Sequence, residues 1–119
     1  MFGTIARFQL KPGTQARLFE LLRNFESANI DGYTGQYVYR SDRDPNEYYL
    51  AVIFRDRESY MANAHSPEQD RRYRQLTELF VGEPEWHDGE IVFSTAYEST
   101  AYEAEVASFY GGWENMRAA

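Results

Sequence analysis

The sequence contains no cysteine among its 119 residues, which excludes disulfide bonds, thiol nucleophiles and thiolate metal sites. It also lacks a surplus of positive charge, because 12 Lys and Arg stand against 19 Asp and Glu, for a formal net charge of −7. Contacts with phosphates need a basic footprint, so this balance argues against nucleic acid as a partner. The one basic cluster, Arg71, Arg72 and Arg74, is surrounded by acidic side chains, and we interpret it as a solvated helix face.

Long apolar runs are missing as well. No stretch approaches the roughly 20 apolar residues that a helix needs to cross a bilayer. The chain starts directly with Met1-Phe2-Gly3-Thr4-Ile5 and shows no basic segment of the kind that opens a signal peptide. These absences predict a cytoplasmic protein without a membrane partner.

Aromatic side chains are abundant: ten Tyr and eight Phe help to raise the aromatic share to 17%. The length of the chain predicts a single domain with its own core. A small monomeric core hides less aromatic area than this. Such a surplus is typical of a protein interface or a ligand pocket.

Hydrophobic periodicity predicts the elements of the first half. Alternation indicates strands over 2–10, 33–40 and 47–54, and the turn formers of 41–46 join the last two in a hairpin. Thr14 can cap a helix that follows the first strand. The apolar stripe of that helix consists of Leu18, Leu21, Leu22 and Phe25.

The strand over 47–54 is apolar on both faces. One face carries Tyr48, Leu50, Val52 and Phe54, and the other carries Tyr49, Ala51 and Ile53. The helices of the domain can cover only one of them. The second face therefore predicts a partner sheet from another copy of the chain.

A capping signal marks the main helix of the second half. Ser66 can cap it, Pro67 suits its first turn and Gln69 completes a capping box. The apolar stripe of this helix consists of Tyr73, Leu76 and Phe80. A short helix is expected over 56–64. The segment 81–84 should end the main helix, and the last strand is predicted at Ile91, Val92 and Phe93.

We divide the chain into a domain of residues 1–95 and a C-terminal helical extension of residues 96–119. Thr100 and Glu103 form a second capping box, and a helix is expected over 100–110. Its aromatic stripe consists of Tyr102, Val106, Phe109 and Trp113. Such a stripe needs a surface to bury it, in its own subunit or in a neighbour.

This β-α-β-β-α-β order, with Ser66-Pro67-Glu68-Gln69 and the segment 82–89 (Gly-Glu-Pro-Glu-Trp-His-Asp-Gly), resembles the antibiotic biosynthesis monooxygenase-like family. The resemblance covers about residues 1–95. It implies an α+β, ferredoxin-like domain with a four-stranded antiparallel sheet. It also implies a homodimer, a dimeric α/β barrel in which the sheets of two subunits pack face to face.

The resemblance implies activities of two kinds. Members include cofactor-independent oxygenases that act on polyketide aromatics and enzymes that degrade haem. Arg7 stands near the position where haem-degrading members place a pocket Asn, so the resemblance argues against haem degradation. His65 and His87 lack the spacing of a helical metal pair, and neither a metal nor another cofactor is expected.

The family places its polar pocket residues in the stretch after the third strand. From this we predict three catalytic residues, Tyr60, Asn63 and His65, and three substrate-binding residues, Arg7, Tyr73 and Trp86.

Each assignment has an alternative. His65 is the predicted base, yet it can also be a surface-loop histidine. Asn63 can stabilise an oxyanion or simply stand where a helix ends. Arg7 can hold an anionic substrate or form an ion pair, and aromatic residues such as Tyr73 and Trp86 can stack on a planar ligand or pack in the protein.

Two functions follow. The first is a cofactor-independent monooxygenase that deprotonates a small phenol, quinol or polyketide-like aromatic and lets the anion reduce O2. The second is a non-catalytic, dimeric ligand-binding or stress-associated barrel protein. An open pocket with His65 facing inward favours the first, and a pocket filled by Tyr and Phe side chains favours the second.

Overall fold

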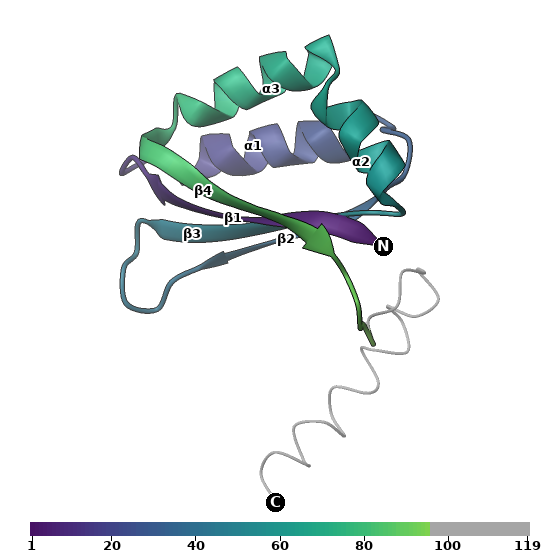
Figure 1. The fold of residues 1–119 in the computed structure, drawn as a ribbon. Helices are drawn as coiled ribbons and strands as arrows, with labels where there is room; N and C mark the ends of the chain where they lie inside the picture. The colour runs from purple at the N-terminus through teal and green to yellow at the C-terminus, as the bar shows by residue number, and fades with distance from the viewer. Residues whose placement is uncertain (96–119) are drawn as a thin grey trace, which may run out of the picture.

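The computed structural model describes residues 1–95, which form a four-stranded sheet with three helices on one face (Figure 1). The elements follow in the order β1 (Phe2–Leu10), α1 (Gln15–Glu26), β2 (Tyr33–Arg40), β3 (Glu47–Phe54), α2 (Arg57–Ala64), α3 (Pro67–Thr77) and β4 (Phe80–Glu90). The strand order across the sheet is β2-β3-β1-β4, and all neighbouring strands are antiparallel. This confirms the predicted ferredoxin-like fold, with two helices between β3 and β4.

Two further expectations concern the C-terminal extension and the absence of a membrane-spanning helix. The predicted helix over 100–110 and the extension that carries it lie outside the described residues. None of the helices within residues 1–95 has the length and apolarity to span a membrane.

The predicted start of α3 is confirmed, and the predicted capping box is only half formed. The Ser66 side chain accepts a hydrogen bond from the Gln69 N–H at 3.1 Å, and Pro67 occupies the first turn. The Gln69 side chain does not return to the N–H of Ser66, because its carbonyl oxygen accepts from the Arg72 guanidinium at 3.2 Å. The Ser66 N–H donates instead to the carbonyl of Asn63.

The other two helices begin differently from each other. The Asp56 carboxylate caps α2 by accepting from the Ser59 N–H at 2.8 Å, and this hydrogen bond is the main reason that the pKa of Asp56 falls to about 2. The predicted side-chain cap of α1 by Thr14 is wrong. The Thr14 hydroxyl donates backwards to the Lys11 carbonyl at 2.7 Å and makes no hydrogen bond to the first turn of α1.

The last strand was predicted too late in the chain. β4 spans Phe80–Glu90 and includes the segment 81–84 that was expected only to end the helix, while residues 91–93 lie beyond the strand. Pro84 is tolerated because β4 is an edge strand that pairs only with β1. The ladder to β1 shifts register nearby, where Gly82 has a φ of +74°.

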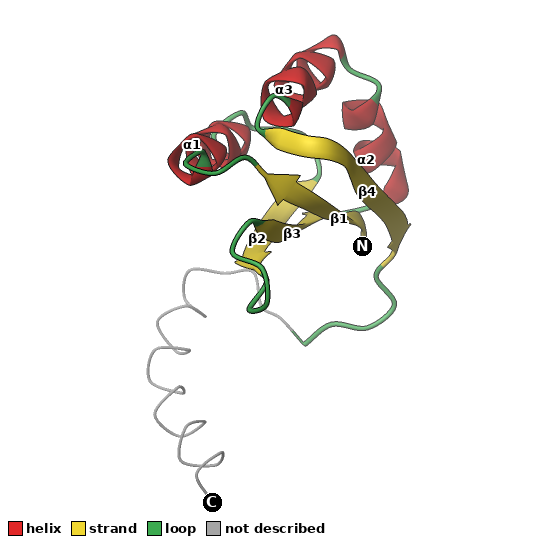
Figure 2. Ribbon diagram, turned by 90° about the vertical axis from the view of Figure 1, so that its left-hand side faces the viewer, coloured by secondary structure: helices red, strands yellow, loops and turns green. Residues whose placement is uncertain are grey.

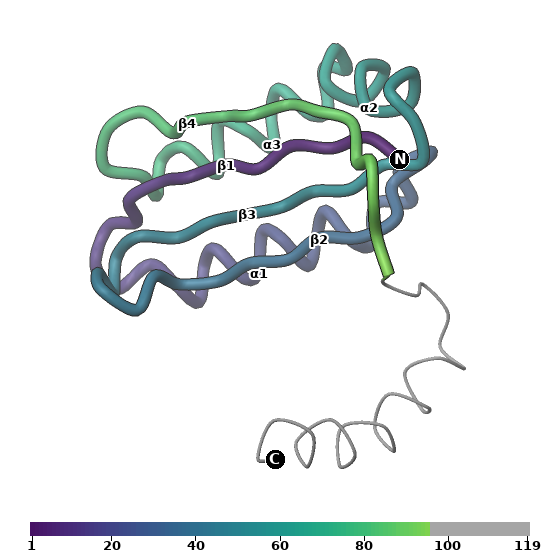
Figure 3. The backbone as a smooth tube through the Cα atoms, turned by 60° about the horizontal axis from the view of Figure 1, so that its bottom comes forward, coloured from purple at the N-terminus to yellow at the C-terminus, as the bar shows by residue number. Residues whose placement is uncertain are grey.

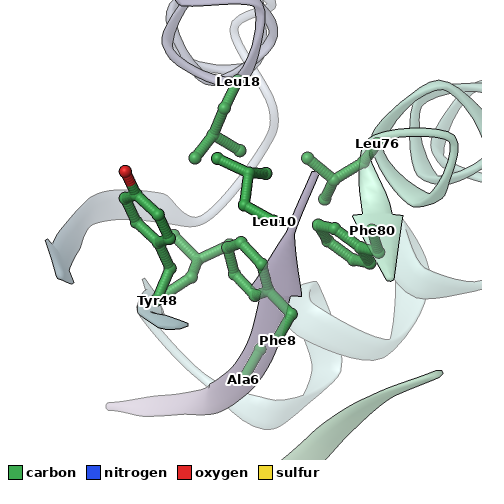
Figure 4. Close-up of a cluster of buried hydrophobic side chains, with 8 residues drawn as sticks. Ala6, Phe8, Leu10, Leu18, Tyr48, Leu76 and Phe80 are labelled. Carbon is green, nitrogen blue, oxygen red and sulfur yellow. The ribbon is translucent and has the colours of Figure 1, made fainter. Parts of the chain in front are cut away.

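The core lies between the sheet and the helices (Figure 4). Its buried members are Ala6, Phe8, Leu10, Leu18, Tyr48, Leu50, Leu76 and Phe80. The Phe8 ring stacks on Phe80 with centroids 4.3 Å apart and on Tyr48 at 6.0 Å. Residues at every second position of β1 and β3 therefore face the helices, and we call this side of the sheet the inner face.

The outer face of the sheet has no helix over it among the described residues (Figures 2 and 3). It carries Ile5, Arg7, Tyr37, Tyr39, Tyr49, Ala51 and Ile53. Ile5, Tyr37 and Tyr39 are 53%, 59% and 61% exposed, and the Tyr39 and Tyr49 rings stack at 4.9 Å. The predicted second apolar face of the third strand is thus present, and no helix within residues 1–95 covers it.

Two glycines on one row of the sheet allow a matched test of its packing. A Cβ on Gly3 would lie 2.2 Å from the Val52 carbonyl oxygen, whereas a Cβ on Gly35 meets nothing within 4 Å. We expect Gly3→Ala to lower the free energy of unfolding by about 1–3 kcal/mol, because β1 must shift against β3. Gly35→Ala should leave it unchanged or raise it slightly. Urea denaturation measures both, and equal values would contradict the close approach at Gly3.

Candidate functional site

A cavity of about 290 Å³ lies between the inner face of the sheet and the three helices. Its floor consists of Thr4, Gln36, Leu50, Val52, Phe54 and Trp86 from the four strands. α1 contributes Leu22 and Phe25 to the roof, and α2 and α3 contribute polar side chains. Apolar and aromatic walls with a few polar groups are typical of a site for a small organic ligand.

Four of the six predicted site residues line this cavity. They are Tyr60 and Asn63 from α2, Tyr73 from α3 and Trp86 from β4. These residues are up to 26 positions apart in the chain, and the packing of α2 and α3 over β4 brings them together. Their chemical roles remain predictions.

His65 is not among the residues that line the cavity. It is exposed and directly follows α2, where its backbone N–H donates to the Met61 carbonyl at 3.0 Å. This place matches the alternative of a surface-loop histidine. The structure does not bring its imidazole to the cavity.

Arg7 lies on the outer face, on the other side of the sheet from the cavity. Its Nε donates to the Glu47 carboxylate at 2.8 Å, and Glu85 lies 3.9 Å from Nη1. The hydrogen bond to Glu47 raises the pKa of the guanidinium. The ion-pair alternative therefore describes Arg7 as the structure places it.

Tyr60 is held by a neighbour that the sequence did not single out. Its hydroxyl donates to the Asp88 carboxylate at 2.8 Å, and its ring packs 5.5 Å from that of Phe54. Burial and this hydrogen bond raise the pKa of Tyr60 to about 12, so the phenol is protonated near neutral pH. Asp88 was not among the predicted site residues. The pairing of Thr4 with Asp88 between β1 and β4 places it beside the cavity.

Tyr73 and Trp86 form a second linked pair in the wall. The Trp86 indole N–H donates to the Tyr73 hydroxyl oxygen at 3.2 Å, and the rings meet edge to face at 5.7 Å. In this hydrogen bond the Tyr73 oxygen is the acceptor, so the hydrogen of its hydroxyl is not used and can donate to a ligand. The pair fixes two aromatic surfaces at one end of the cavity.

Sequence reasoning did not predict several polar residues of the cavity lining as site residues, among them Gln36, Thr4 and Arg72. The Gln36 amide donates to the Leu22 carbonyl at 3.0 Å, and its oxygen Oε1 is buried with no partner among the described residues. The Thr4 hydroxyl is also buried without a hydrogen bond of normal geometry, although it lies near enough to Tyr60 to lower the pKa of that phenol. Arg72, interpreted as solvated, lines the cavity and lies over the Phe25 ring at 5.8 Å.

The family model for antibiotic biosynthesis monooxygenases matches residues 1–74, which is more than half of the chain. The chain belongs to this family. The predicted resemblance is confirmed, and it now covers β1 to most of α3. No curated protein matches the chain significantly.

Solved structures agree with this family assignment. A variant of SnoaB, a cofactor-independent oxygenase from Streptomyces nogalater, has 13% identity and a TM-score of 0.68, with 81% of this chain and 97% of that chain covered. The protein Rv0793 from Mycobacterium tuberculosis has 22% identity and a TM-score of 0.63, with 80% and 98% covered. A conserved protein from Methanosarcina mazei has 19% identity and a TM-score of 0.63, with 74% and 89% covered. At these identities the likeness shows the shared fold of the antibiotic biosynthesis monooxygenases.

Metal ligands do not cluster in the part of this family member that the structure describes. Within residues 1–95, no group of three or more His, Asp or Glu side chains is placed to hold a metal ion. The titratable side chains in the cavity lining are Tyr60, Asp70, Arg72 and Tyr73. Tyr60 is hydrogen-bonded to Asp88, and Asp70 is bridged to Arg74 at 2.7 Å.

The Tyr60–Asp88 hydrogen bond has a measurable consequence. We expect Asp88→Asn to lower the pKa of Tyr60 towards its ordinary value of 10, because the substitution removes the carboxylate charge that disfavours the phenolate. In the native protein Tyr60 stabilises the fold below pH 10 and loses this contribution as the pH rises through about 12. Ultraviolet titration of tyrosinate, with Tyr60→Phe as the reference, isolates this phenol. An unchanged titration in Asp88→Asn would contradict the hydrogen bond.

Proposed function

We propose that the chain is a cofactor-independent monooxygenase that oxidises a small hydroxylated aromatic compound in the cavity. The observation that carries the proposal is the cavity itself, walled by Tyr60, Tyr73 and Trp86 and furnished with the Asn63 amide, in a member of the antibiotic biosynthesis monooxygenase family. The fold it shares with a cofactor-independent oxygenase supports the same reaction class. Aromatic walls suit a planar ligand, and the amide suits an oxygen that gains negative charge.

In the proposed reaction the substrate supplies all the electrons. Loss of the phenolic proton leaves an electron-rich ring anion, and a ring carbon that bears hydrogen forms a C–O bond with O2. After protonation the hydroperoxide loses water as a new carbonyl forms at that carbon. One oxygen atom stays in the product and the other leaves as water, so the substrate provides the four electrons that reduce O2.

The protein contributes proton transfer and charge stabilisation. Tyr60 takes the phenolic proton as its own hydrogen moves along the 2.8 Å hydrogen bond to Asp88. The Asn63 side chain donates to the resulting oxyanion. This route replaces the predicted use of His65, which is exposed outside the cavity.

We also propose that the enzyme is a homodimer formed by the outer faces of two sheets. The outer face carries exposed aromatic and aliphatic side chains, among them Ile5, Tyr37 and Tyr39. A contiguous exposed patch of this kind marks an interaction surface. A second copy would cover it with the same residues, as a two-fold symmetric interface requires.

One observation favours the non-catalytic alternative: the histidine predicted as the base is outside the cavity. Oxygen consumption decides between the two functions. An oxygen electrode follows uptake while the purified chain meets a panel of phenols, quinols and anthrone-like compounds, each with a protein-free control. Enzyme-dependent uptake, with one oxygen atom incorporated into the product per O2 consumed, supports the oxygenase. Binding of the same compounds without uptake supports the ligand-binding protein.

A further inference from the structure

The carbonyl oxygen of Gln36 is a hydrogen-bond acceptor without a donor. The Leu22 carbonyl can only accept, so the NH2 group of the Gln36 amide must face it, which turns Oε1 away from α1. Oε1 is buried, lies in a residue of the cavity floor and has no partner in residues 1–95. A buried acceptor left unpaired destabilises the protein, and a ligand hydroxyl would satisfy it.

A second buried polar group lies on the same row of the sheet. Gln36 pairs with Val52, and Val52 pairs with Thr4, whose side chain is only 5% exposed. Neighbouring strands are about 4.8 Å apart, so the backbones of Gln36 and Thr4 are about 10 Å apart across the floor. The floor therefore offers polar groups at two separated points with an apolar valine between them.

The wall of the cavity carries one positive charge that is not neutralised. Arg72 is half-buried and donates only to the neutral Gln69 amide, and no carboxylate within residues 1–95 lies within 4.0 Å of it. The one acidic residue in the lining, Asp70, is bridged to Arg74 at 2.7 Å. A guanidinium with most of its N–H groups free is suited to a bidentate pair with a carboxylate.

We propose that the substrate is an aromatic carboxylate that carries a second hydroxyl besides the one that Tyr60 deprotonates. This second hydroxyl donates to Gln36, and the carboxylate pairs with Arg72. This inference rests on the proposed function and narrows its substrate class. A cavity of about 290 Å³ is at the small end of ligand sites, which span about 300–1,000 Å³, so the ligand has one or two rings.

Calorimetry without oxygen tests the inference, because no turnover can then disturb the binding. Three two-ring probes separate the two contacts: a hydroxynaphthoate with its substituents at opposite ends, naphthoate and naphthol. We expect the full chain to bind the hydroxynaphthoate about tenfold or more tightly than either single-function probe.

Two variants assign the contacts. Arg72→Gln should weaken the hydroxynaphthoate and naphthoate by about 10–100-fold and leave naphthol unchanged. Gln36→Leu should weaken the hydroxynaphthoate and naphthol and leave naphthoate unchanged. Arg71→Gln is the matched control, since Arg71 is the exposed neighbour of Arg72 outside the cavity lining, and it should bind all three probes as the native chain does.

Equal affinity for the three probes, or equal effects of the Arg71 and Arg72 substitutions, would overturn the inference. These results do not depend on oxygen chemistry. Oxygen uptake with a neutral phenol, together with no binding preference for carboxylates, would support the oxygenase function and contradict the proposed carboxylate substrate. The expected binding pattern, with no oxygen uptake on any probe, would support the carboxylate ligand and contradict the oxygenase function.

Discussion

Asn63→Ala should lower the rate of enzyme-dependent oxygen uptake by about 10²–10³-fold, the usual cost of removing one donor from a developing oxyanion. Asn63 lines the cavity near the end of α2, beside Tyr60 of the same helix. Its amide can donate to a substrate oxygen that Tyr60 has deprotonated. The comparison is made on any substrate that the native chain oxidises, with kcat and KM measured separately. A loss mainly in kcat indicates an interaction made in the transition state.

His65→Ala is the matched control for this experiment. His65 is two residues further along the chain, but it is exposed and outside the cavity, so we expect its replacement to leave uptake within a few-fold of native. Tyr60→Phe should reduce uptake by about 10²–10⁴-fold, since it removes the proposed proton carrier. The opposite result, with activity lost in His65→Ala and kept in Tyr60→Phe, would return the role of base to the histidine.

Ala51→Glu is expected to convert the proposed dimer into monomers. Ala51 pairs with Ile5 on one side and Tyr37 on the other, in the middle of the outer face. A glutamate there would be buried in the proposed interface, and an unpaired buried charge of this kind costs several kcal/mol. Light scattering should show the native chain at twice its 13.9 kDa mass and the variant at 13.9 kDa.

The same substitution at a solvent-exposed site controls for added charge. Ala16 is exposed in the first turn of α1, where an acidic side chain is favourable to the helix dipole. Ala16→Glu should therefore remain dimeric. A native chain that scatters as a monomer at micromolar concentration would refute the homodimer itself, whatever the variants do.

Several helix and strand boundaries were predicted correctly from signals between close neighbours in the chain. Ser66 and Pro67 mark the start of α3 because a cap needs only the N–H groups of the next turn. The strands over 33–40 and 47–54 were predicted with the bounds that the structure has, since alternation within each run and the turn formers between them are local features. Thr14 shows the limit of such signals. Its hydroxyl donates to the nearby Lys11 carbonyl and does not cap α1.

The position of β4 could not be predicted in the same way. Gly82 and Pro84 look like breakers in the sequence, and they become acceptable only because β4 is an edge strand with a register shift against β1. Whether a strand is at an edge depends on the order of strands in the sheet. The local sequence does not contain that order.

Hydrophobic period and capping chemistry act over a few residues, so they predicted the order of helices and strands and a third strand that is apolar on both faces. The ferredoxin-like topology came from the family resemblance. The same resemblance pointed to the stretch after β3, where Tyr60 and Asn63 line the cavity. Which polar groups share the cavity depends on the packing of the helices on the sheet. This packing places Asn63, Gln36 and Arg72 in the cavity lining and leaves His65 outside it. It also brings the Tyr60 hydroxyl within hydrogen-bond distance of Asp88. The reason is geometric: these groups meet through strand order and helix packing, which no spacing along the chain records.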